Sequence, residues 1–418
     1  MTELAGRRVL VVGLARSGVA ASEALVAQGA KVTAYDRDES IDAGRLRELG
    51  VEVRLGLEEE QLLQGIDLVV TSPGVPADAP SIAGAHARGI DVWSELELGA
   101  RLLPNPLVAI TGTNGKTTTT ALLGEMFARA GVQAEVAGNI GRALTSLVGA
   151  SDESAWVVCE VGVAQLDDAD TFHPRIAVLL NLEPDHLDRY GTFEWYADTK
   201  LRVFEQQTED DVAIVPAAFG PIPGGARRVE FSAEDRLPAE PTIPGRHNRE
   251  NAAAATAAAR AAGLSDDAIA QALVGFRGVE HRIEEIAELG GVRYVNDSKA
   301  TNAAAALRAI EALRDSPLHV ILGGLGKNES YDALAAAFRP GDSAYLIGRA
   351  APELAAALDA TAVVFTHSGD LPRAVQDAAG AARPGEIVLL SPACASFDQF
   401  TDYEARGDAF RRLVEELR

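Results

Sequence analysis

The residues best suited to chemistry in this chain form one glycine-rich run, Thr111-Gly-Thr-Asn-Gly-Lys-Thr117. The apolar residues before it predict a buried strand, and the apolar residues after it predict a helix. Gly112 and Gly115 allow backbone N–H groups to converge on one point, and Lys116 adds a positive charge there. Such a loop at a helix N-terminus holds the phosphates of a nucleoside triphosphate. Because Ile110 stands where the common P-loop pattern has glycine, an ordinary strand-to-helix turn is the alternative.

Groups that can bind a cation follow the neighbouring strands. The hydroxyl of Thr117 suits Mg²⁺, and Glu160 ends the strand predicted over residues 155–159. His186 lies in an acidic run after the strand predicted over residues 176–180. Isolated histidines are usually packed or exposed, but such groups beside a phosphate loop are what Mg²⁺–nucleotide chemistry requires. We therefore predict a magnesium site at this edge of a central sheet.

Lys200 has an unusual position. We predict a helix over residues 193–207, in which Lys200 is four residues after Tyr196 and four residues before Phe204. That spacing puts the lysine on the apolar stripe of the helix. One alternative is that its ammonium group extends along the stem to water. A lysine that stays inside needs a partner, or a modification that removes its charge.

Two amides, Asn248 and Asn251, lie at the start of an alanine-rich helix that we predict to continue to about Ala262. Their i, i+3 spacing places them on one face of the helix. Helix capping explains one asparagine well and both less well, so contact with a ligand is the other interpretation.

The start of the chain predicts a βαβ unit. A strand over residues 8–12 leads into Gly13-Leu-Ala-Arg-Ser-Gly18, a helix follows, and a second strand ends at Asp36, where a carboxylate could bind a ribose. Ala15 replaces the glycine that lets a pyrophosphate approach this loop, so a nucleotide diphosphate other than NAD fits better. A further strand ends in the turn before Gly74, at the edge where open α/β sheets bind ligands. A structural domain without a ligand is the alternative.

The last third of the chain repeats this arrangement. Predicted strands end in polar or glycine-rich runs at residues 296–302, 323–327 and 391–396. The side chains of Lys299, Lys327 and Ser396 in these runs would suit a small anionic substrate.

The 418 residues are enough for two to four domains, and the alternation of strands and helices predicts an α/β fold. We place a Rossmann-like N-terminal domain at residues 1–92, a central P-loop ATPase-type domain with a parallel sheet at 93–278, and a C-terminal Rossmann-like domain at 279–418. The net charge of −23 argues against a nucleic-acid or anionic-membrane partner. Cys159 and Cys394 have no metal-type spacing and fit a reducing compartment. No apolar run approaches the roughly 18 residues of a bilayer span and no signal peptide is visible, so we expect a cytoplasmic protein, and a monomer.

Together these segments resemble the Mur ligases of peptidoglycan synthesis, from about Arg8 to Arg411. The phosphate loop and residues 181–190 are similar to the ATPase motifs that the family shares. Residues 296–302 and 391–400 resemble the branch that adds D-glutamate, whereas other branches and the folylpolyglutamate synthetases, the second candidate, carry other residues there. The resemblance implies an ATP-dependent ligase that adds D-glutamate to UDP-N-acetylmuramoyl-L-alanine through an acyl phosphate.

The resemblance also implies roles for individual residues. Catalysis and the binding of two Mg²⁺ ions would depend on Lys116, Thr117, Glu160, His186 and Lys200. Lys200 would be carbamylated, which turns a cation into a carboxylate-like metal ligand. Contacts to ATP are implied for Gly112, Thr113, Asn114, Gly115, Lys116, Thr117, Thr118, Asn248, Asn251, Arg282 and Asp297. The UDP-sugar groove would contain Ser17, Asp36, Ser72, Gly74, Asn139 and Gln165. The D-glutamate pocket would contain Thr301, Lys327, Ser396, Phe397 and Tyr403, with Lys299 nearby.

One departure from the family lies after Glu160, where the D-glutamate-adding branch usually reads Ser-Ser-Phe-Gln and this chain has Gly162-Val-Ala-Gln165. The change removes two hydroxyls and an aromatic ring beside the substrate groove and leaves the implied metal ligands in place. Two other functions compete with a ligase. An NAD-dependent oxidoreductase would use only the first domain. A non-catalytic Mur-like subunit could lose the metal-binding set, but Glu160, His186 and Lys200 are all present.

Overall fold

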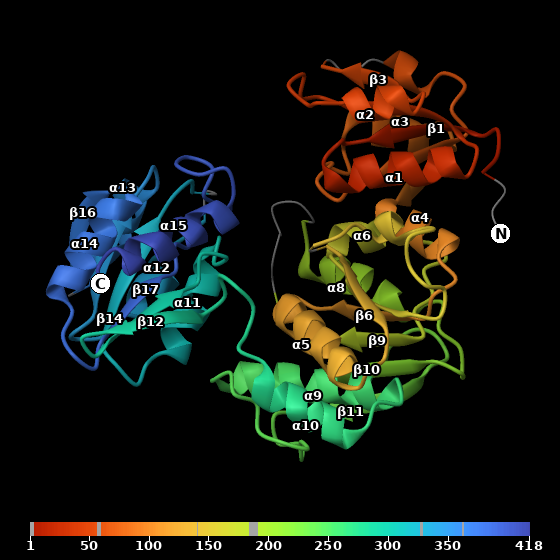
Figure 1. The fold of residues 1–418 in the computed structure, drawn as a ribbon. Helices are drawn as coiled ribbons and strands as arrows, with labels where there is room; N and C mark the ends of the chain where they lie inside the picture. The colour runs from red at the N-terminus through yellow and green to blue at the C-terminus, as the bar shows by residue number, and fades with distance from the viewer. Residues whose placement is uncertain (1–3, 57–59, 140, 184–190, 327–328, 362) are drawn as a thin grey trace. The chain divides into compact units, whose positions relative to one another are not determined.

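The computed structural model describes residues 4–56, 60–139, 141–183, 191–326, 329–361 and 363–418. The chain forms two compact units, Met1–Phe276 and Arg277–Arg418. The first unit contains two β-sheets and the second unit contains one (Figure 1).

The first sheet has the strand order β3-β2-β1-β4-β5, and all its strand pairs are parallel. Its strands are β1 (Arg8–Val12), β2 (Lys31–Asp36), β3 (Glu52–Leu55), β4 (Leu68–Thr71) and β5 (Asp91–Ser94). The helices along it are α1 (Arg16–Ala27), α2 (Gly44–Glu48), the 3₁₀ helix η1 (Glu60–Leu63), α3 (Pro80–Ala87) and α4 (Glu95–Leu102). Alternate residues of β1 pack into opposite cores, Val9 and Val11 into one and Leu10 and Val12 into the other, as a central parallel strand requires.

Glycine shapes the turn from β1 into α1. Gly13 has a φ of +88°, which favours glycine. A Cβ atom on Gly18 would lie 1.7 Å from the carbonyl oxygen of Gly13, so only glycine lets the helix approach the strand this closely. The predicted βαβ unit is therefore confirmed. Its two fingerprint glycines are required for different reasons, Gly13 for its positive φ and Gly18 for the close approach of helix and strand.

The second sheet has the order β11-β10-β9-β6-β8-β7 and is also parallel throughout. Its strands are β6 (Leu107–Thr111), β7 (Ala134–Gly138), β8 (Trp156–Glu160), β9 (Ile176–Leu179), β10 (Val212–Pro216) and β11 (Arg227–Phe231). Its helices are α5 (Lys116–Arg129), η2 (Leu144–Leu147), α6 (Val163–Asp167), α8 (Phe193–Leu201), η3 (Arg202–Phe204), α9 (Arg246–Ala261) and α10 (Asp266–Gly275). Helix α5 packs against α9 and α10 (Figure 1). Because β6 lies between β8 and β9, the segments after these three strands meet at one edge of the sheet.

The third sheet forms the second unit and has the order β12-β13-β17-β14-β15-β16. Its strands are β12 (Glu284–Leu289), β13 (Val292–Asn296), β14 (Leu318–Gly323), β15 (Ser343–Ile347), β16 (Val364–Gly369) and β17 (Ile387–Leu390). Its helices are α11 (Ala303–Ala312), α12 (Asp332–Ala336), α13 (Ala351–Asp359), α14 (Leu371–Ala381) and α15 (Tyr403–Glu415). Only the β12–β13 pair is antiparallel. The polar runs expected to carry a substrate site follow three adjacent strands, β13, β17 and β14.

The predicted α/β fold class is confirmed, with parallel sheets in the first unit and a mixed sheet in the second. The helix expected over residues 193–207 is shorter than predicted, because α8 ends at Leu201 and the chain tightens into η3. Two edge strands, β12 and β16, were not predicted, since their exposure follows no regular alternation. Within the described ranges, no helix is long and apolar enough to cross a membrane.

Candidate active site

The phosphate loop joins β6 to α5, and its conformation requires glycine at two positions. Gly112 has a φ of +145° and Gly115 has a φ of +84°. A Cβ atom on Gly115 would lie 2.2 Å from Oδ1 of Asn251, and one on Gly112 would lie 3.0 Å from Cβ of Leu180. Helix α5 begins at Lys116, so its N-terminal backbone donors lie at this loop. The geometry is that of an anion-binding turn at a helix N-terminus.

The segment after β9 holds the loop from the other side. The N–H of Asn114 donates to Oδ1 of Asn181 (2.8 Å), and its side-chain Nδ2 donates to Oε2 of Glu183 (2.8 Å). Oγ1 of Thr113 accepts hydrogen bonds from the backbone N–H of Glu183 (3.0 Å) and from the hydroxyl of Tyr196 (3.1 Å). These contacts fix the loop, which lowers the entropic cost of binding a ligand there.

Two lysine ammonium groups converge on one carbonyl oxygen. Nζ of Lys116 donates to the carbonyl of Gly112 (2.9 Å) and to that of Thr113 (2.9 Å). Nζ of Lys200 donates to the same Gly112 carbonyl (2.9 Å) and lies 4.9 Å from the ring centroid of Tyr196. Lys200 is only 1% exposed. Its predicted inward position is confirmed, and the alternative that it extends to water is wrong.

Glu160 carries a buried carboxylate at the same edge. It is 2% exposed, and its register with Ile110 places it on the strand next to the phosphate loop. Oε1 accepts a hydrogen bond from Nδ2 of Asn139 (3.0 Å), whereas Oε2 is buried and has no hydrogen-bond partner among the described residues. A buried carboxylate oxygen without a donor is costly and is the type of ligand that Mg²⁺ prefers. The buried Thr117 lies in the first turn of α5, directly after the phosphate loop that follows β6.

The remaining metal ligand implied by the sequence, His186, lies outside the described residues. In the described part of the chain, no group of three or more His, Cys, Asp or Glu side chains could hold a metal. Of the implied metal ligands, the described residues provide the Glu160 carboxylate and the Thr117 hydroxyl at this edge, together with Lys200 in its unmodified form.

The residues after Glu160 form a compact turn around Gln165. Its Oε1 accepts a hydrogen bond from the N–H of Gly162 (2.9 Å), while its Nε2 is buried without a partner in the described part of the chain. A Cβ atom on Gly162 would lie 3.1 Å from Oδ1 of Asn139. A side chain at position 162 would therefore lie in tight contact with Asn139.

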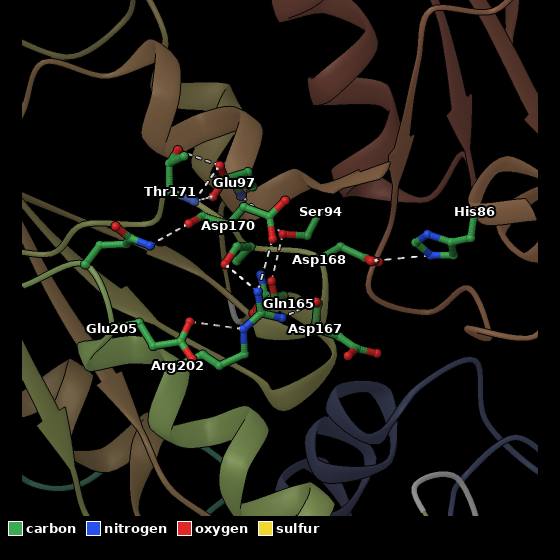
Figure 2. A network of polar contacts seen from close by, with 12 residues as sticks. His86, Ser94, Glu97, Gln165, Asp167, Asp168, Asp170, Thr171, Arg202 and Glu205 are labelled. Carbon is green, nitrogen blue, oxygen red and sulfur yellow. Dashed lines mark hydrogen bonds and ion pairs between the residues drawn. The ribbon is translucent and has the colours of Figure 1, made fainter. Parts of the chain in front are cut away.

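The first turn of α4 holds the turn that contains Gln165 (Figure 2). Oγ of Ser94 donates to the carbonyl of Gln165 (2.7 Å), and the backbone N–H of Ser94 donates to the carbonyl of Asp168 (2.8 Å). The fully buried Glu97 accepts from both the N–H (3.0 Å) and the hydroxyl (2.6 Å) of Thr171. Residues 165–171 are thus anchored at both ends, directly after the strand that carries Glu160.

Arg202 holds the same turn from η3 (Figure 2). Its guanidinium donates to the carbonyl of Asp167 and pairs with Asp170 (3.1 Å) and with Glu205 (3.4 Å). Burial raises the pKa of the Asp168 carboxyl to about 6, and Nε2 of His86 lies 3.9 Å away from it. The network thus holds the backbone of residues 165–171 in place and includes one carboxyl, that of Asp168, whose pKa is raised by burial.

The carboxyl edge of the first sheet contains the residues expected to bind a UDP-sugar. Oγ of Ser72 donates to the carbonyl of Gly13 (2.8 Å), and Oδ2 of Asp36 accepts from the N–H of Leu14 (2.6 Å). Both side chains therefore contact the loop after β1. Ser17 is half-buried in the first turn of α1, and Gly74 is exposed.

The two asparagines at the start of α9 do not cap the helix. Its N-cap residue is Gly245, and no side chain makes the capping bond. Nδ2 of Asn248 donates to the carbonyl of Pro244 (2.6 Å), and Asn251, 6% exposed, lies against Gly115 of the phosphate loop. The capping interpretation is wrong, and Asn251 is brought to the predicted nucleotide site.

In the second unit, Asp297 follows β13 and is buried. Its Oδ2 accepts from the hydroxyl of Ser391 (2.7 Å) and its Oδ1 accepts from the N–H of Ile283 (3.2 Å). Burial raises the pKa of this carboxyl to about 7, against the opposing effects of the Ser391 hydrogen bond and of the nearby positive charge of Arg282. The structure therefore brings Asp297 and Arg282 together, as two predicted nucleotide contacts.

The residues expected to bind the amino acid differ in exposure. Nζ of Lys299 lies 5.4 Å from the ring centroid of the half-buried Tyr403. Thr301 is half-buried just before α11, and Ser396 is 2% exposed. Phe397 is 69% exposed, and Lys327 lies outside the described residues. The pairing of Lys299 with Tyr403 is the contact that the structure shows among them.

Two buried groups that no sequence pattern predicts support these loops. Arg406 of α15 is 1% exposed and donates to the hydroxyl (3.0 Å) and carbonyl (2.8 Å) of Ser298 and to the carbonyl of Cys394 (3.1 Å). Nδ1 of the buried His281 lies 2.9 Å from Nδ2 of Asn296. Neither residue belongs to a glycine-rich loop or a strand end, so no local pattern could have found it.

Three family models match the chain. Residues 7–94 match "Mur ligase MurD-like, N-terminal domain", residues 110–219 match "Mur ligase middle domain", and residues 281–394 match "Mur ligase, glutamate ligase domain". The matches include strands of all three sheets and the phosphate loop, and the fold and this loop therefore define a Mur ligase.

Similar curated proteins show which branch of the Mur ligases the chain belongs to. The chain is 46% identical over 432 residues to the UDP-N-acetylmuramoylalanine–D-glutamate ligase of Sphingopyxis alaskensis, a match that spans 99% of this chain and 98% of the relative. It is 43% identical over 448 residues to the enzyme of that name from Acidobacterium capsulatum, across 99% and 97% of the two chains. The chain belongs to the UDP-N-acetylmuramoylalanine–D-glutamate ligase family of Mur ligases.

Solved structures agree on the fold. The UDP-N-acetylmuramate–alanine ligase MurC of Thermotoga maritima has a TM-score of 0.61 at 18% identity, over 98% of this chain and 100% of that one. The MurF ligase of Thermotoga maritima in complex with ADP has a TM-score of 0.63 at 17% identity, over 100% of both chains.

Proposed function

We propose that this chain is an ATP-dependent ligase that joins D-glutamate to UDP-N-acetylmuramoyl-L-alanine in the cytoplasmic synthesis of peptidoglycan precursors. The names of relatives at 43–46% identity support the substrates. The phosphate loop after β6 and the buried Glu160 beside it support the use of ATP with a divalent cation.

The chemistry begins with a carboxylate that an amine cannot attack at neutral pH. The γ-phosphate of ATP is transferred to the L-alanine carboxylate, so that an acyl phosphate and ADP form. The D-glutamate amine then attacks the acyl carbon, the C–O bond to phosphate breaks, and the products are an amide and inorganic phosphate. Lys116 and the N-terminus of α5 offset the negative charge of the phosphates during transfer. No covalent protein nucleophile takes part.

The proposed site would hold two Mg²⁺ ions through Thr117, Glu160, His186 and a carbamate on Lys200. Bound Mg²⁺ neutralises charge between the phosphates and the substrate carboxylate. The buried position of Lys200 supports its carbamylation, because an unmodified ammonium group there would repel a cation.

Binding of the substrates is divided among three domains at residues 1–92, 93–278 and 279–418, in a monomer. The first domain and the segments after β7 and β8 hold the UDP-sugar through Ser17, Asp36, Ser72, Gly74, Asn139 and Gln165. Nucleotide contacts come from the loop residues 112–118 and from Asn248, Asn251, Arg282 and Asp297. The amino acid is held by Lys299, Thr301, Lys327, Ser396, Phe397 and Tyr403.

One observation carries this proposal: among the described residues, no donor bonds the buried Oε2 of Glu160, which lies beside a loop where Lys116 and Lys200 share a carbonyl. The test is phosphate release from ATP with the UDP-sugar and a panel of D- and L-amino acids. Release should require the UDP-sugar and D-glutamate together. Release that prefers another amino acid, or none with any member of the panel, would overturn the assignment.

A further inference from the structure

A strained turn precedes β12 and contains Arg282. The residues on either side of it have positive φ angles, +61° for His281 and +45° for Ile283. Such angles are uncommon for residues other than glycine, and for a β-branched residue such as isoleucine they are a clear outlier. Strain of this kind persists only where surrounding contacts hold the backbone in place.

Asp297 provides one of these contacts. Its Oδ1 accepts from the N–H of Ile283 (3.2 Å), the more strained of the two residues. Its own N–H donates to the carbonyl of Leu390 (2.7 Å), which ties it to β17. A carboxylate anchored to the sheet thus binds the turn that carries Arg282.

The other oxygen of Asp297 is held by Ser391. The hydroxyl of this serine is fully buried at the carboxyl end of β17 and donates to Oδ2 over 2.7 Å. The charged groups that face the carboxylate are Arg282 in the strained turn and Arg406 of α15. Ser391 is thus the neutral donor that fixes the orientation of the carboxylate between two cations.

We propose that Ser391 is a positioning residue for the nucleotide site, which fixes the Asp297 carboxylate and through it the strained turn that presents Arg282. This inference rests on the proposed function, in which Asp297 and Arg282 contact ATP. Ser391 itself touches no reacting group in this account. Its hydroxyl acts by stabilising the ionised form of Asp297, because a carboxylate accepts this hydrogen bond more strongly than a neutral carboxyl does.

The test compares Ser391→Ala with Ser368→Ala in the full-length chain. Ser368 also donates to an aspartate in the second unit, Oδ2 of Asp377 (2.9 Å), but that pair lies outside the proposed site. The first measurement is the titration of the Asp297 carboxyl carbon by ¹³C NMR, with the signal assigned through Asp297→Asn. The pKa of Asp297 should rise by about one unit in Ser391→Ala and should not change in Ser368→Ala. An unchanged titration in Ser391→Ala would overturn the proposal whether or not the chain is a ligase.

The second measurement is the pH profile of ATP-dependent phosphate release. In Ser391→Ala the KM for ATP should rise several-fold and the acid limb of kcat/KM should move up by about one pH unit, with the KM for the UDP-sugar unchanged. A loss of kcat with an unmoved acid limb would contradict positioning. Ser391→Cys, a weaker donor of similar shape, should give an intermediate shift if the alanine variant does not fold. If the wild-type chain released no phosphate, the proposed function would fail while the NMR result still decided the role of Ser391.

Discussion

The carboxyl edges of the second and third sheets both carry polar loops, but their charged groups differ in how fully they are satisfied. At the second sheet, Oε2 of Glu160 is buried and has no donor in the part of the chain that the structure describes, and two lysines share the carbonyl of Gly112. At the third sheet, both oxygens of Asp297 accept hydrogen bonds from the protein. The edge of the second sheet thus has a buried oxygen that a bound cation could satisfy, whereas the edge of the third sheet already satisfies its carboxylate with protein donors. We infer that the second sheet supplies the reaction centre and the third sheet supplies positioned contacts.

The largest expected effect comes from Lys116→Ala. This change removes the ammonium group that donates to the Gly112 and Thr113 carbonyls and that we propose offsets the charge of the phosphates, so kcat should fall by about 10²–10³ while the fold is retained. Phosphate release measures the loss, and circular dichroism checks the fold. Lys31→Ala, at an exposed lysine, is the control and should retain wild-type turnover. If a folded Lys116→Ala variant released phosphate at the wild-type rate, the phosphate loop of the second sheet would not be part of the reaction centre.

Lys200→Ala tests whether activity requires an ammonium group or a carbamate at position 200. The buried position of Lys200 at the phosphate loop, together with the proposed metal site, predicts a carboxylate-like group there in the active enzyme. Activity should therefore be lost and then partly restored by short carboxylic acids such as acetate. Restoration by a small amine would instead show that an ammonium group is needed, and full activity without any addition would show that neither is.

The site features of the second sheet could be predicted from the sequence better than those of the third sheet. The phosphate loop, the strand ending at Glu160 and the inward position of Lys200 follow from glycine placement and helical spacing, which are local properties. The positive φ of His281 and Ile283 does not follow from any local pattern, because both residue types normally avoid that region.

The partners that fix the third sheet's loops could not be predicted for a related reason. Ser391 and Asp297 are far apart in the chain and meet only because β13 and β17 are neighbours. Arg406 is charged and would be expected at the surface of α15, but backbone carbonyls from two separate loops satisfy it inside. Such contacts depend on strand order and on tertiary packing, which the pattern of a short stretch of sequence does not show.

Glu160→Gln tests whether the unpartnered oxygen binds a cation. The amide keeps an acceptor for Asn139 but replaces the second oxygen with a group that cannot ligate Mg²⁺. The Mg²⁺ concentration for half-maximal activity should rise by about 10–100-fold. Glu95→Gln is a matched control, since Glu95 is also buried and, within the described ranges, has one oxygen without a hydrogen-bond partner, while its other oxygen is bonded to Thr145. An equal rise in both variants would show a general structural effect.

A smaller effect concerns stability. Burial raises the pKa of Asp297 to about 7, far above the usual value of about 3.9 for an unfolded chain. The folded state therefore binds this proton more tightly, and the contribution of Asp297 to stability is lost as pH rises from about 4 through 7. Relative to Asp297→Asn, the wild-type chain should lose roughly 1.4 kcal/mol of unfolding free energy per pH unit in that window. The unfolding free energy of both chains is measured by urea titration across this pH range. If the two free energies changed with pH in the same way, the raised pKa of Asp297 in the folded state would be contradicted.

The central claim, that the edge of the second sheet activates a substrate carboxylate with ATP, is tested most directly by oxygen transfer. UDP-N-acetylmuramoyl-L-alanine labelled with ¹⁸O in its carboxylate is turned over with ATP and D-glutamate, and the inorganic phosphate is analysed by mass spectrometry. An acyl phosphate predicts one ¹⁸O atom in each phosphate released, because the bridging oxygen leaves with the phosphorus. Phosphate that contains no ¹⁸O, formed together with the amide product, would contradict the account.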